Sequence, residues 1–493
     1  MKAWSEEIDQ YLDEFIRLEG RGNYSVQQYC LECRKGSPEF RCVDCFSGKL
    51  FCASCIVNIH RRNPFHRVKK WSSPGYFEPK YLRKLGLRIQ LGHPCLAPVP
   101  ATDFTILDTY AIHKLLRTRL YPATMKQPRT AATFNVLKRY EVLSFESKCS
   151  AYQYYRSIAR GSDNTGICDT REQYREFLRM TRCWSALKIF KRAGRGHDPN
   201  GVQGTRLGEC AILCPACPQP GINLPDNWRE APNNQKWLYT LFLAIDANFR
   251  LLWFRNIVVS SAKRSPSRFL GYGYFVKTKP YLKHLENHTG EKQALSQCVS
   301  HDAVNSADSR DTQGCAATGC GAVDCARHEF RRLNSIGDLQ KGERYLNMDY
   351  LFYSSLAEKS YKRLVVSYNI ACQWSSKFHQ RMSQKFPPDW FVNKGDVGIT
   401  FLVPKFHLPA HIEKCHRDYS FNLTKGVGRT DGEGVERGWA RINDLASSTR
   451  EMGPGARQDK LESHMGDSNW KKTTMMGTSV QLIPFLKLIF PFR

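Results

Sequence analysis

Before residue 205, and outside one cysteine-rich stretch, apolar residues recur mainly at helical spacing. Apolar positions 4, 8, 11, 12, 15 and 18 form one stripe, which predicts a helix within residues 1–24 that Gly20 can end. Residues 101–204 are predicted to be a mainly helical region with many basic positions.

Three apolar runs in the second half of the chain are typical of buried strands. They span Trp237–Phe249, Arg363–Ile370 and Val397–Val403. Asp246 lies near the end of the first run, and Asn369 lies near the end of the second. The carboxylate of Asp246 is costly to bury unless it binds a cation or accepts hydrogen bonds. Alternatively, Asp246 could simply cap the end of the strand.

A further helix is predicted to begin around residues 432–439, where Glu433 and Glu436 share one face. The predicted strands and helices of this half of the chain are together typical of an α/β fold. His407 and His411 follow the third run, and we expect them to be structural or to contact substrate rather than to bind a separate metal.

Length and charge restrict the class of partner. A chain of 493 residues predicts two to four domains, and its 73 Lys+Arg against 46 Asp+Glu give a net charge of +27. This excess indicates a polyanionic partner, nucleic acid before a membrane surface. No apolar stretch approaches the roughly 20 residues of a membrane helix, and the first 20 residues do not resemble a secretory signal. We expect a soluble, intracellular protein without a membrane partner.

The cysteine pattern indicates metal sites rather than disulfides, because the 19 cysteines are an odd number and cluster in close pairs. Six cysteines and two histidines in residues 25–72 can supply the eight ligands of two tetrahedral Zn²⁺ sites. An interleaved pairing would use Cys30, Cys33, Cys52 and Cys55 for one site, and Cys42, Cys45, His60 and His66 for the other. This is the cross-brace order of B-box-like fingers, which the stretch resembles, although the spacing leaves other pairings open.

Two later features have an open interpretation. Cys214 and Cys217 could complete a zinc site with Cys325 and His328, or the first pair could simply pack among prolines. A cationic segment around residues 193–196 could follow a DNA backbone or be a solvated linker. Its candidate DNA-binding residues are Lys188, Lys191, Arg192 and Arg195.

Several motifs in order resemble the Kyakuja-Dileera-Zisupton (KDZ) transposases, a group with associated CxC2 cysteine-cluster domains that is expanded in fungal genomes. The matching stretches are Cys214–Pro225, Asp246–Phe249, Cys325–His328, Gly337–Tyr345, Ser367–Trp374, Asp431–Glu433 and Glu451–Arg457. The resemblance covers roughly residues 205–470, and residues 25–100 resemble the CxC2-like module.

The resemblance implies a ribonuclease-H-like core with a DDE-type centre, in which two aspartates and a glutamate hold two Mg²⁺ ions that act in DNA strand cleavage and transfer. Asp246 matches the first aspartate, and either Glu433 or Glu436 matches the glutamate. Asn369 stands where the family has its second aspartate. An amide brings no negative charge to the metals, so we expect a degenerate copy with impaired activity.

The expected organisation is a terminal helix in residues 1–24, a B-box-like, CxC2-like zinc module in 25–100, a helical region in 101–204, the core in 205–475 with a zinc-binding insert at about 255–360, and an irregular, truncated tail in 476–493. We expect a nuclear protein that binds transposon ends and target DNA, and a homo-oligomer remains open. Two alternatives are a catalytically inactive zinc- and DNA-binding protein and a scaffold that binds a protein partner through its zinc module.

Overall fold

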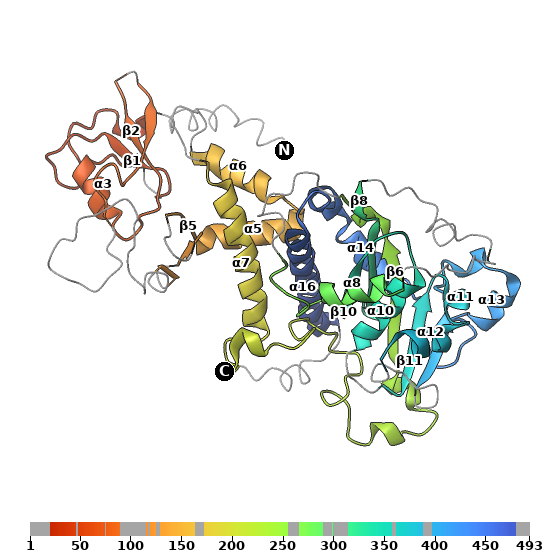
Figure 1. Cartoon of the computed structure of the whole chain (residues 1–493). Helices are drawn as coiled ribbons and strands as arrows, with labels where there is room; N and C mark the ends of the chain where they lie inside the picture. The colour runs from red at the N-terminus through yellow and green to blue at the C-terminus, as the bar shows by residue number, and fades with distance from the viewer. Residues whose placement is uncertain are drawn as a thin grey trace, which may run out of the picture. The chain divides into compact units, whose positions relative to one another are not determined.

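The computed structural model describes residues 20–45, 48–73, 75–88, 115–116, 119–124, 129–162, 172–254, 266–288, 298, 314–356, 361–387 and 397–479. The chain divides into two compact units, each of which is described by itself (Figure 1). Unit 1 comprises Met1–Ser144 and Cys149–Met180, and unit 2 comprises Phe145–Lys148 and Thr181–Arg493. Residues 1–19 of the predicted terminal helix, and the tail from residue 480, lie outside the described residues.

The first part of unit 1 is a small antiparallel sheet with one short helix. The short helix η1 (Gly22–Tyr24) comes first in the chain. The sheet then has the order β1 (Phe40–Cys42), β2 (Val68–Trp71), β3 (Phe77–Lys80), and helix α3 (Ala53–Ile59) packs on it. Its buried core consists of Phe40, Cys42, Ile56, Val68, Leu82 and Leu87. So few apolar side chains rarely stabilise a domain of this size, so a metal or other cross-link is expected to contribute.

The rest of unit 1 is mainly helical, as the sequence predicts for residues 101–204. A hairpin of β4 (Leu120–Pro122) and β5 (Ala131–Thr133) precedes α5 (Phe134–Ser147), α6 (Ala151–Ser162) and α7 (Tyr174–Arg192), of which α5 and α7 continue into unit 2. The ring of Tyr140 on α5 contacts Tyr154 on α6 and Phe177 on α7, at centroid distances of 5.3 and 5.5 Å. These aromatic contacts hold the three helices together.

A mixed five-stranded sheet forms the centre of unit 2, with the order β10-β9-β6-β11-β12. The strands are β6 (Leu241–Asn248), β9 (Gly319–Cys325), β10 (Arg331–Leu339), β11 (Arg363–Tyr368) and β12 (Gly398–Leu402). β6, β9 and β10 pair antiparallel, whereas β11 is parallel to both β6 and β12. β6, β11 and β12 lie within the three apolar runs from which strands are predicted.

Side chains of β6 alternate between two cores, one on each face of the sheet. Leu241, Leu243 and Ile245 pack with α10 (Tyr345–Leu356), α11 (Ala371–Trp374) and α12 (Phe378–Lys385). Phe242 and Ala244 pack on the other face with α14 (Gly434–Ala440) and α16 (Pro454–Ser479), which is seen beside the sheet in Figure 1. Each fully buried large apolar side chain contributes about 1.5–3 kcal/mol, so this two-sided burial explains why the run is continuously apolar.

The remaining elements of unit 2 are short. They are η2 (Gly201–Gly204), η3 (Trp228–Glu230), η4 (Lys236–Tyr239), η5 (Phe249–Leu251), β7 (Trp253–Phe254), α8 (Thr278–Glu286), β8 (Cys315–Ala317), η8 (Leu408–Ala410), α13 (Glu413–Asp418), η9 (Asn443–Leu445) and α15 (Ala446–Thr449). Within the described residues, no helix has the length and apolar content needed to cross a membrane.

The expected insert at 255–360 requires a correction, because this interval contains β9, β10 and α10 and so supplies two of the five sheet strands. Its strands escape the hydrophobic pattern because they bury charged residues. Arg331 on β10 pairs with Asp324 on β9 at 2.9 Å, and the guanidinium of Arg332 donates to the carbonyl of Ser355. Paired charges can be buried in a sheet, but their partners are not visible in the local sequence.

Candidate active site and metal centres

Asp246 lies on β6 with only 8% of its surface exposed. Alternation along the strand puts it on the same face as Phe242 and Ala244, which is the face that α14 covers. Burial raises the pKa of Asp246 well above its usual value, and the nearby carboxylates of Glu343 and Glu436 raise it further. A carboxylate in such a place favours a bound cation or proton.

Asn369 directly follows β11, the parallel neighbour of β6. The register pairs Tyr368 with Ile245, so Asn369 and Asp246 are the next residues on adjacent strands. The side-chain Nδ2 of Asn369 donates a hydrogen bond to Oδ1 of Asp246 at 3.3 Å. The structure therefore brings these two predicted site residues together.

Glu433 and Glu436 have different surroundings at the start of α14. Glu433 is the N-cap residue, and its Oε1 accepts a hydrogen bond from the backbone N–H of Phe406 at 2.9 Å. Glu436 lies in the first turn, and its charge raises the pKa of Asp246. Of the two predicted alternatives, Glu436 is thus the one that interacts electrostatically with Asp246.

His407 connects both glutamates. Its Nε2 lies 2.7 Å from Oε1 of Glu436 and 3.8 Å from Oε2 of Glu433. The hydrogen bond with Glu436 raises the pKa of His407 and lowers the pKa of Glu436, whereas burial raises the pKa of Glu433. One ligand atom from each of the three lies within 4.8 Å of the others, so His407, Glu433 and Glu436 are close enough to share a cation.

Glu343 is a buried acid that the sequence analysis missed. It accepts a hydrogen bond from the hydroxyl of Tyr368 at 2.5 Å, and burial raises its pKa. Its charge also raises the pKa of Asp246. The only signal was its place in the Gly337–Tyr345 motif, because it ends no apolar run and belongs to no predicted helix face.

Two other acids in this part of the core have partners elsewhere. Asp338 binds the guanidinium of Arg457 at 2.5 Å and accepts from the thiol of Cys320. The fully buried Asp349 binds Arg381 at 2.8 Å and accepts from the indole of Trp374 at 2.7 Å. Both acids are therefore already paired with an arginine in their own surroundings.

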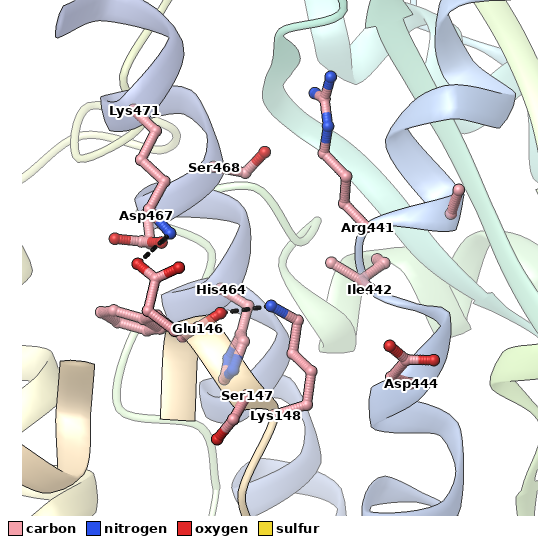
Figure 2. A pocket seen from close by; sticks show the side chains of 12 residues that line it. Glu146, Ser147, Lys148, Arg441, Ile442, Asp444, His464, Asp467, Ser468 and Lys471 are labelled. Carbon is pink, nitrogen blue, oxygen red and sulfur yellow. Dashed lines mark hydrogen bonds and ion pairs between the residues drawn. The ribbon is translucent and has the colours of Figure 1, made fainter. Parts of the chain in front are cut away.

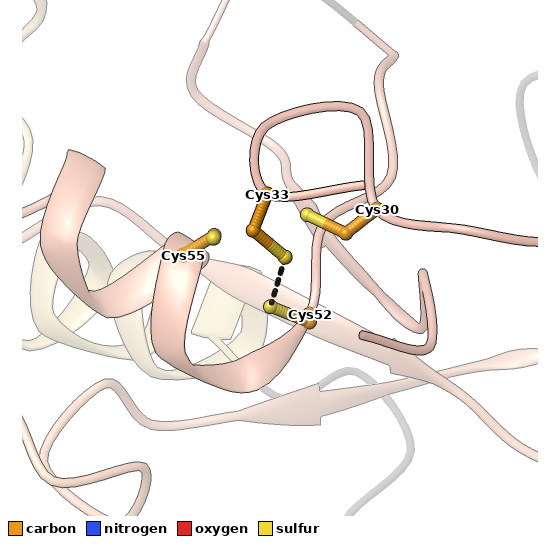
Figure 3. Close-up of side chains that lie close together, drawn as sticks. All are labelled: Cys30, Cys33, Cys52 and Cys55. Carbon is orange, nitrogen blue, oxygen red and sulfur yellow. Dashed lines mark hydrogen bonds between the residues drawn. The ribbon is translucent and has the colours of Figure 1, made fainter. Parts of the chain in front are cut away.

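The eight candidate zinc ligands of unit 1 form two groups, and the grouping is the interleaved one. Figure 3 shows Cys30 and Cys33 facing Cys52 and Cys55, which begin α3. The second group consists of Cys42, Cys45, His60 and His66. Sγ of Cys33 lies 3.7 Å from Sγ of Cys52, and Sγ of Cys45 lies 3.5 Å from Nε2 of His60. Ligands of one tetrahedral zinc lie about 3.6–3.8 Å apart, so both groups suit zinc.

A third group in unit 2 joins the Cys214–Cys217 pair to Cys325 and His328. Nδ1 of His328 lies 3.3 Å from Sγ of Cys214 and 3.5 Å from Sγ of Cys325. These pairs are more than a hundred residues apart in the sequence, and β9 brings them together because it ends at Cys325. The four residues could hold one zinc ion, as the ligand spacing suggests.

His411 does not join His407 beside the acids. Its Nδ1 lies 3.4 Å from Sγ of Cys372, within a further group of thiols. The sequence analysis expected a structural or substrate-contacting histidine here rather than a ligand of a separate metal, whereas the structure places His411 in a group that could hold a metal ion.

The predicted DNA-binding residues are not equivalent in the structure. Lys191 and Arg192 are exposed at the end of α7, and Lys188 is half-buried. Arg195 forms ion pairs with Asp198 at 3.0 Å and with Glu209 at 3.2 Å. Since its charge is already neutralised, Arg195 is a poor candidate for a phosphate contact.

A pocket of about 490 Å³ lies away from the acids, between residues 145–148, α16 and the segment that follows α14 (Figure 2). Three of its charged side chains form ion pairs with one another, and a fourth pairs with a residue outside the lining. Lys471 pairs with Glu146 at 2.7 Å and with Asp467 at 3.0 Å, and Arg441 pairs with Glu329 at 2.7 Å. The pocket contains none of the predicted site residues.

Comparison with known families gives two matches. Residues 239–469 match the model of the Kyakuja-Dileera-Zisupton transposase, and residues 114–166 match that of the CxC2 like cysteine cluster associated with KDZ transposases. No curated protein and no solved structure matches the chain. The CxC2 match falls in the helical region, not over 25–100, where the sequence analysis expected it.

The family match therefore indicates a transposase-like protein. Its α/β core carries Asp246 near the end of a strand, and its Cys/His clusters are suited to zinc. The chain carries a Kyakuja-Dileera-Zisupton transposase domain over residues 239–469 and the associated CxC2 region over residues 114–166. The match to residues 239–469 includes Asp246, Asn369, Glu433 and Glu436.

Proposed function

We propose that unit 2 is a ribonuclease-H-like transposase core. The strand order supports this, because three antiparallel strands are followed along the chain by two strands parallel to the first. The acids support it as well, since Asp246 lies on the first strand and residue 369 directly follows the fourth. The family match covers all five strands.

The proposed centre consists of Asp246, Asn369 and Glu436. Asp246 and Glu436 provide the hard oxygen ligands that Mg²⁺ prefers. Asn369 provides an amide whose nitrogen points to Asp246, so it acts as a hydrogen-bond donor to the very carboxylate that would bind metal. This donor set does not fit two Mg²⁺ ions, because one of three negative charges is missing and two-metal cleavage needs both ions.

We therefore infer a transposase-like protein that binds DNA, through its excess positive charge, in the nucleus, and cleaves it poorly or not at all. The observation that carries this inference is the Asn369–Asp246 hydrogen bond at the point where a pair of carboxylates is expected. Its net charge of +27 supports DNA as the partner. An intact relative would use the same positions to cut transposon ends and join them to target DNA.

A nicking assay with Mg²⁺ on the full chain tests the proposal. We expect little or no cleavage by the unmodified chain and a gain of at least tenfold in Asn369→Asp, because the carboxylate restores the missing charge. Asn369→Ala is the matched control, since it removes the amide without adding charge. Asn369→Asp combined with Asp246→Ala should be inactive.

Robust cleavage by the unmodified chain that Asp246→Ala abolishes would contradict the degenerate centre. If Asn369→Asp stays inactive while both proteins bind duplex DNA, the second candidate function holds, that of a catalytically inactive DNA-binding protein. The Asn369–Asp246 hydrogen bond favours this candidate, because it stabilises a buried carboxylate without metal. If neither protein binds DNA at low salt, a protein scaffold replaces both.

A further inference from the structure

A fourth group of sulfur and nitrogen ligands lies close to the strand end that carries Asn369. It consists of Cys298, Cys372, His411 and Cys415, with one ligand atom of each within 4.8 Å of the others. Cys372 is on α11, His411 directly follows η8, and Cys415 is on α13. Four chain segments, up to 117 residues apart, thus meet at one point.

The distances suit one tetrahedral metal ion. Sγ of Cys298 lies 3.8 Å from Sγ of Cys372 and 4.0 Å from Sγ of Cys415, and Sγ of Cys372 lies 3.4 Å from Nδ1 of His411. Zinc bond lengths put two sulfurs about 3.8 Å apart, and a sulfur and a nitrogen about 3.6 Å apart. These sulfur–sulfur distances are much longer than the roughly 2.05 Å of a disulfide.

We propose that Cys298, Cys372, His411 and Cys415 bind a structural Zn²⁺ ion. Three thiolates and one imidazole are a soft ligand set that selects zinc over Mg²⁺. Four protein ligands close the coordination sphere, which is typical of a structural rather than a catalytic site. Cys298, His411 and Cys415 are each about 5% exposed, so the ion would be shielded from solvent.

The ion would fix two loops of the acidic site to each other. α11 begins two residues after Asn369, and His411 comes four residues after His407, the partner of Glu436. A tyrosine links the same segments, because the hydroxyl of Tyr419 lies 3.5 Å from the carbonyl oxygen of Cys372 and 3.4 Å from the hydroxyl of Ser375. The zinc proposal itself does not depend on whether the chain cleaves DNA.

The test is the zinc content per chain of the reduced full-length protein, measured by elemental mass spectrometry. We expect four zinc ions in the unmodified chain and one fewer in both Cys415→Ser and His411→Ala. His411→Cys should keep the ion, because a thiolate replaces the imidazole. Cys183→Ser is the matched control, because this cysteine of α7 belongs to none of the four groups.

Alkylation of the unmodified chain gives a second measurement that does not depend on how the variants fold. With a chelator, Cys372 and Cys415 should react at least tenfold faster, and earlier than Cys210, a buried cysteine outside the groups that reports general opening. An unchanged zinc content in Cys415→Ser and His411→Ala would overturn the proposal. If these variants are insoluble, alkylation decides, and Cys372 reacting no earlier than Cys210 overturns it.

Discussion

Single buried acids in this protein remain acceptable because specific donors surround them. Asp246 accepts a hydrogen bond from the side-chain amide of Asn369, and Glu343 accepts one from the hydroxyl of Tyr368. Glu462 on α16 accepts hydrogen bonds from the backbone N–H groups of Tyr274 and Phe275. Hydrogen bonds lower the cost of burying a carboxylate but do not abolish it, so these residues couple folding to pH.

Glu462 gives a pH-dependent prediction, because burial raises its pKa from 4.5 to about 7. In the folded chain this acid keeps its proton between pH 4.5 and 7, whereas the unfolded chain releases it, so stability falls as pH rises through this window. A shift of this size corresponds to about 3 kcal/mol. Glu462→Gln mimics the protonated acid at every pH. The free energy of unfolding of this variant, relative to that of the unmodified chain, should therefore rise by about 3 kcal/mol from pH 4.5 to pH 7.5.

Urea unfolding followed by tryptophan fluorescence measures this difference. Comparing both proteins at the same pH cancels effects that they share, such as loss of zinc in acid. If the difference in free energy of unfolding between the two proteins stays constant from pH 4.5 to 7.5, Glu462 has the same pKa in the folded and unfolded chain, and the prediction is wrong.

Among the elements, α14 depends on a tight turn that directs its glutamates. Gly432 precedes Glu433, has a φ of +84°, and lies against Ser367, Phe421 and Pro404. A side chain at this position would meet both an unfavourable backbone conformation and an occupied space. The turn thus requires glycine in order to place Glu436 near the end of β11.

Gly432→Ala should therefore lower the free energy of unfolding by about 2–4 kcal/mol, the combined cost of the left-handed conformation and of overpacking. Gly428→Ala is the matched control, because Gly428 has a φ of +58° but open space around its Cα. It should cost only the conformational part, about 1–2 kcal/mol. The urea midpoint at pH 7 measures both, and equal losses would contradict the steric contribution.

The whole molecule combines a large positive charge with many local ion pairs. Exposed cations such as Lys191 and Arg192 remain available to a polyanion, whereas Arg195 is neutralised by Asp198 and Glu209. Net charge therefore predicts the sign of the partner, and local pairing decides which cations contact it.

We expect duplex DNA affinity to fall steeply between 50 and 200 mM salt, because each neutralised phosphate releases counterions. If Lys191 contacts a phosphate, Lys191→Ala should reduce the slope of log K against log salt by about 0.9. Arg195→Ala is the control and should leave the slope unchanged. Fluorescence anisotropy measures the slopes, and a flat salt dependence of the unmodified chain would contradict phosphate binding.

The sequence by itself determined the features that depend on short spacing. The Cys-x-x-Cys pairs of residues 30–55 put two sulfurs on one side of a turn, so the candidate zinc ligands could be named from the sequence, whereas the structure decided which pairs share a site. The apolar runs around Asp246 and Asn369 likewise predicted strands, because burial on both faces requires continuous hydrophobicity.

Only the tertiary structure decided what depends on distant partners. β9 and β10 were not recognised as strands because the buried charges of Asp324 and Arg331 neutralise each other only once the two strands pair. The choice of Glu436 depended on which face of α14 meets Asp246, and the Cys298–Cys372–His411–Cys415 group depended on four segments converging. The local sequence pattern predicts which residues of a segment are buried, but it does not show which residues elsewhere in the chain will pair with the buried polar groups.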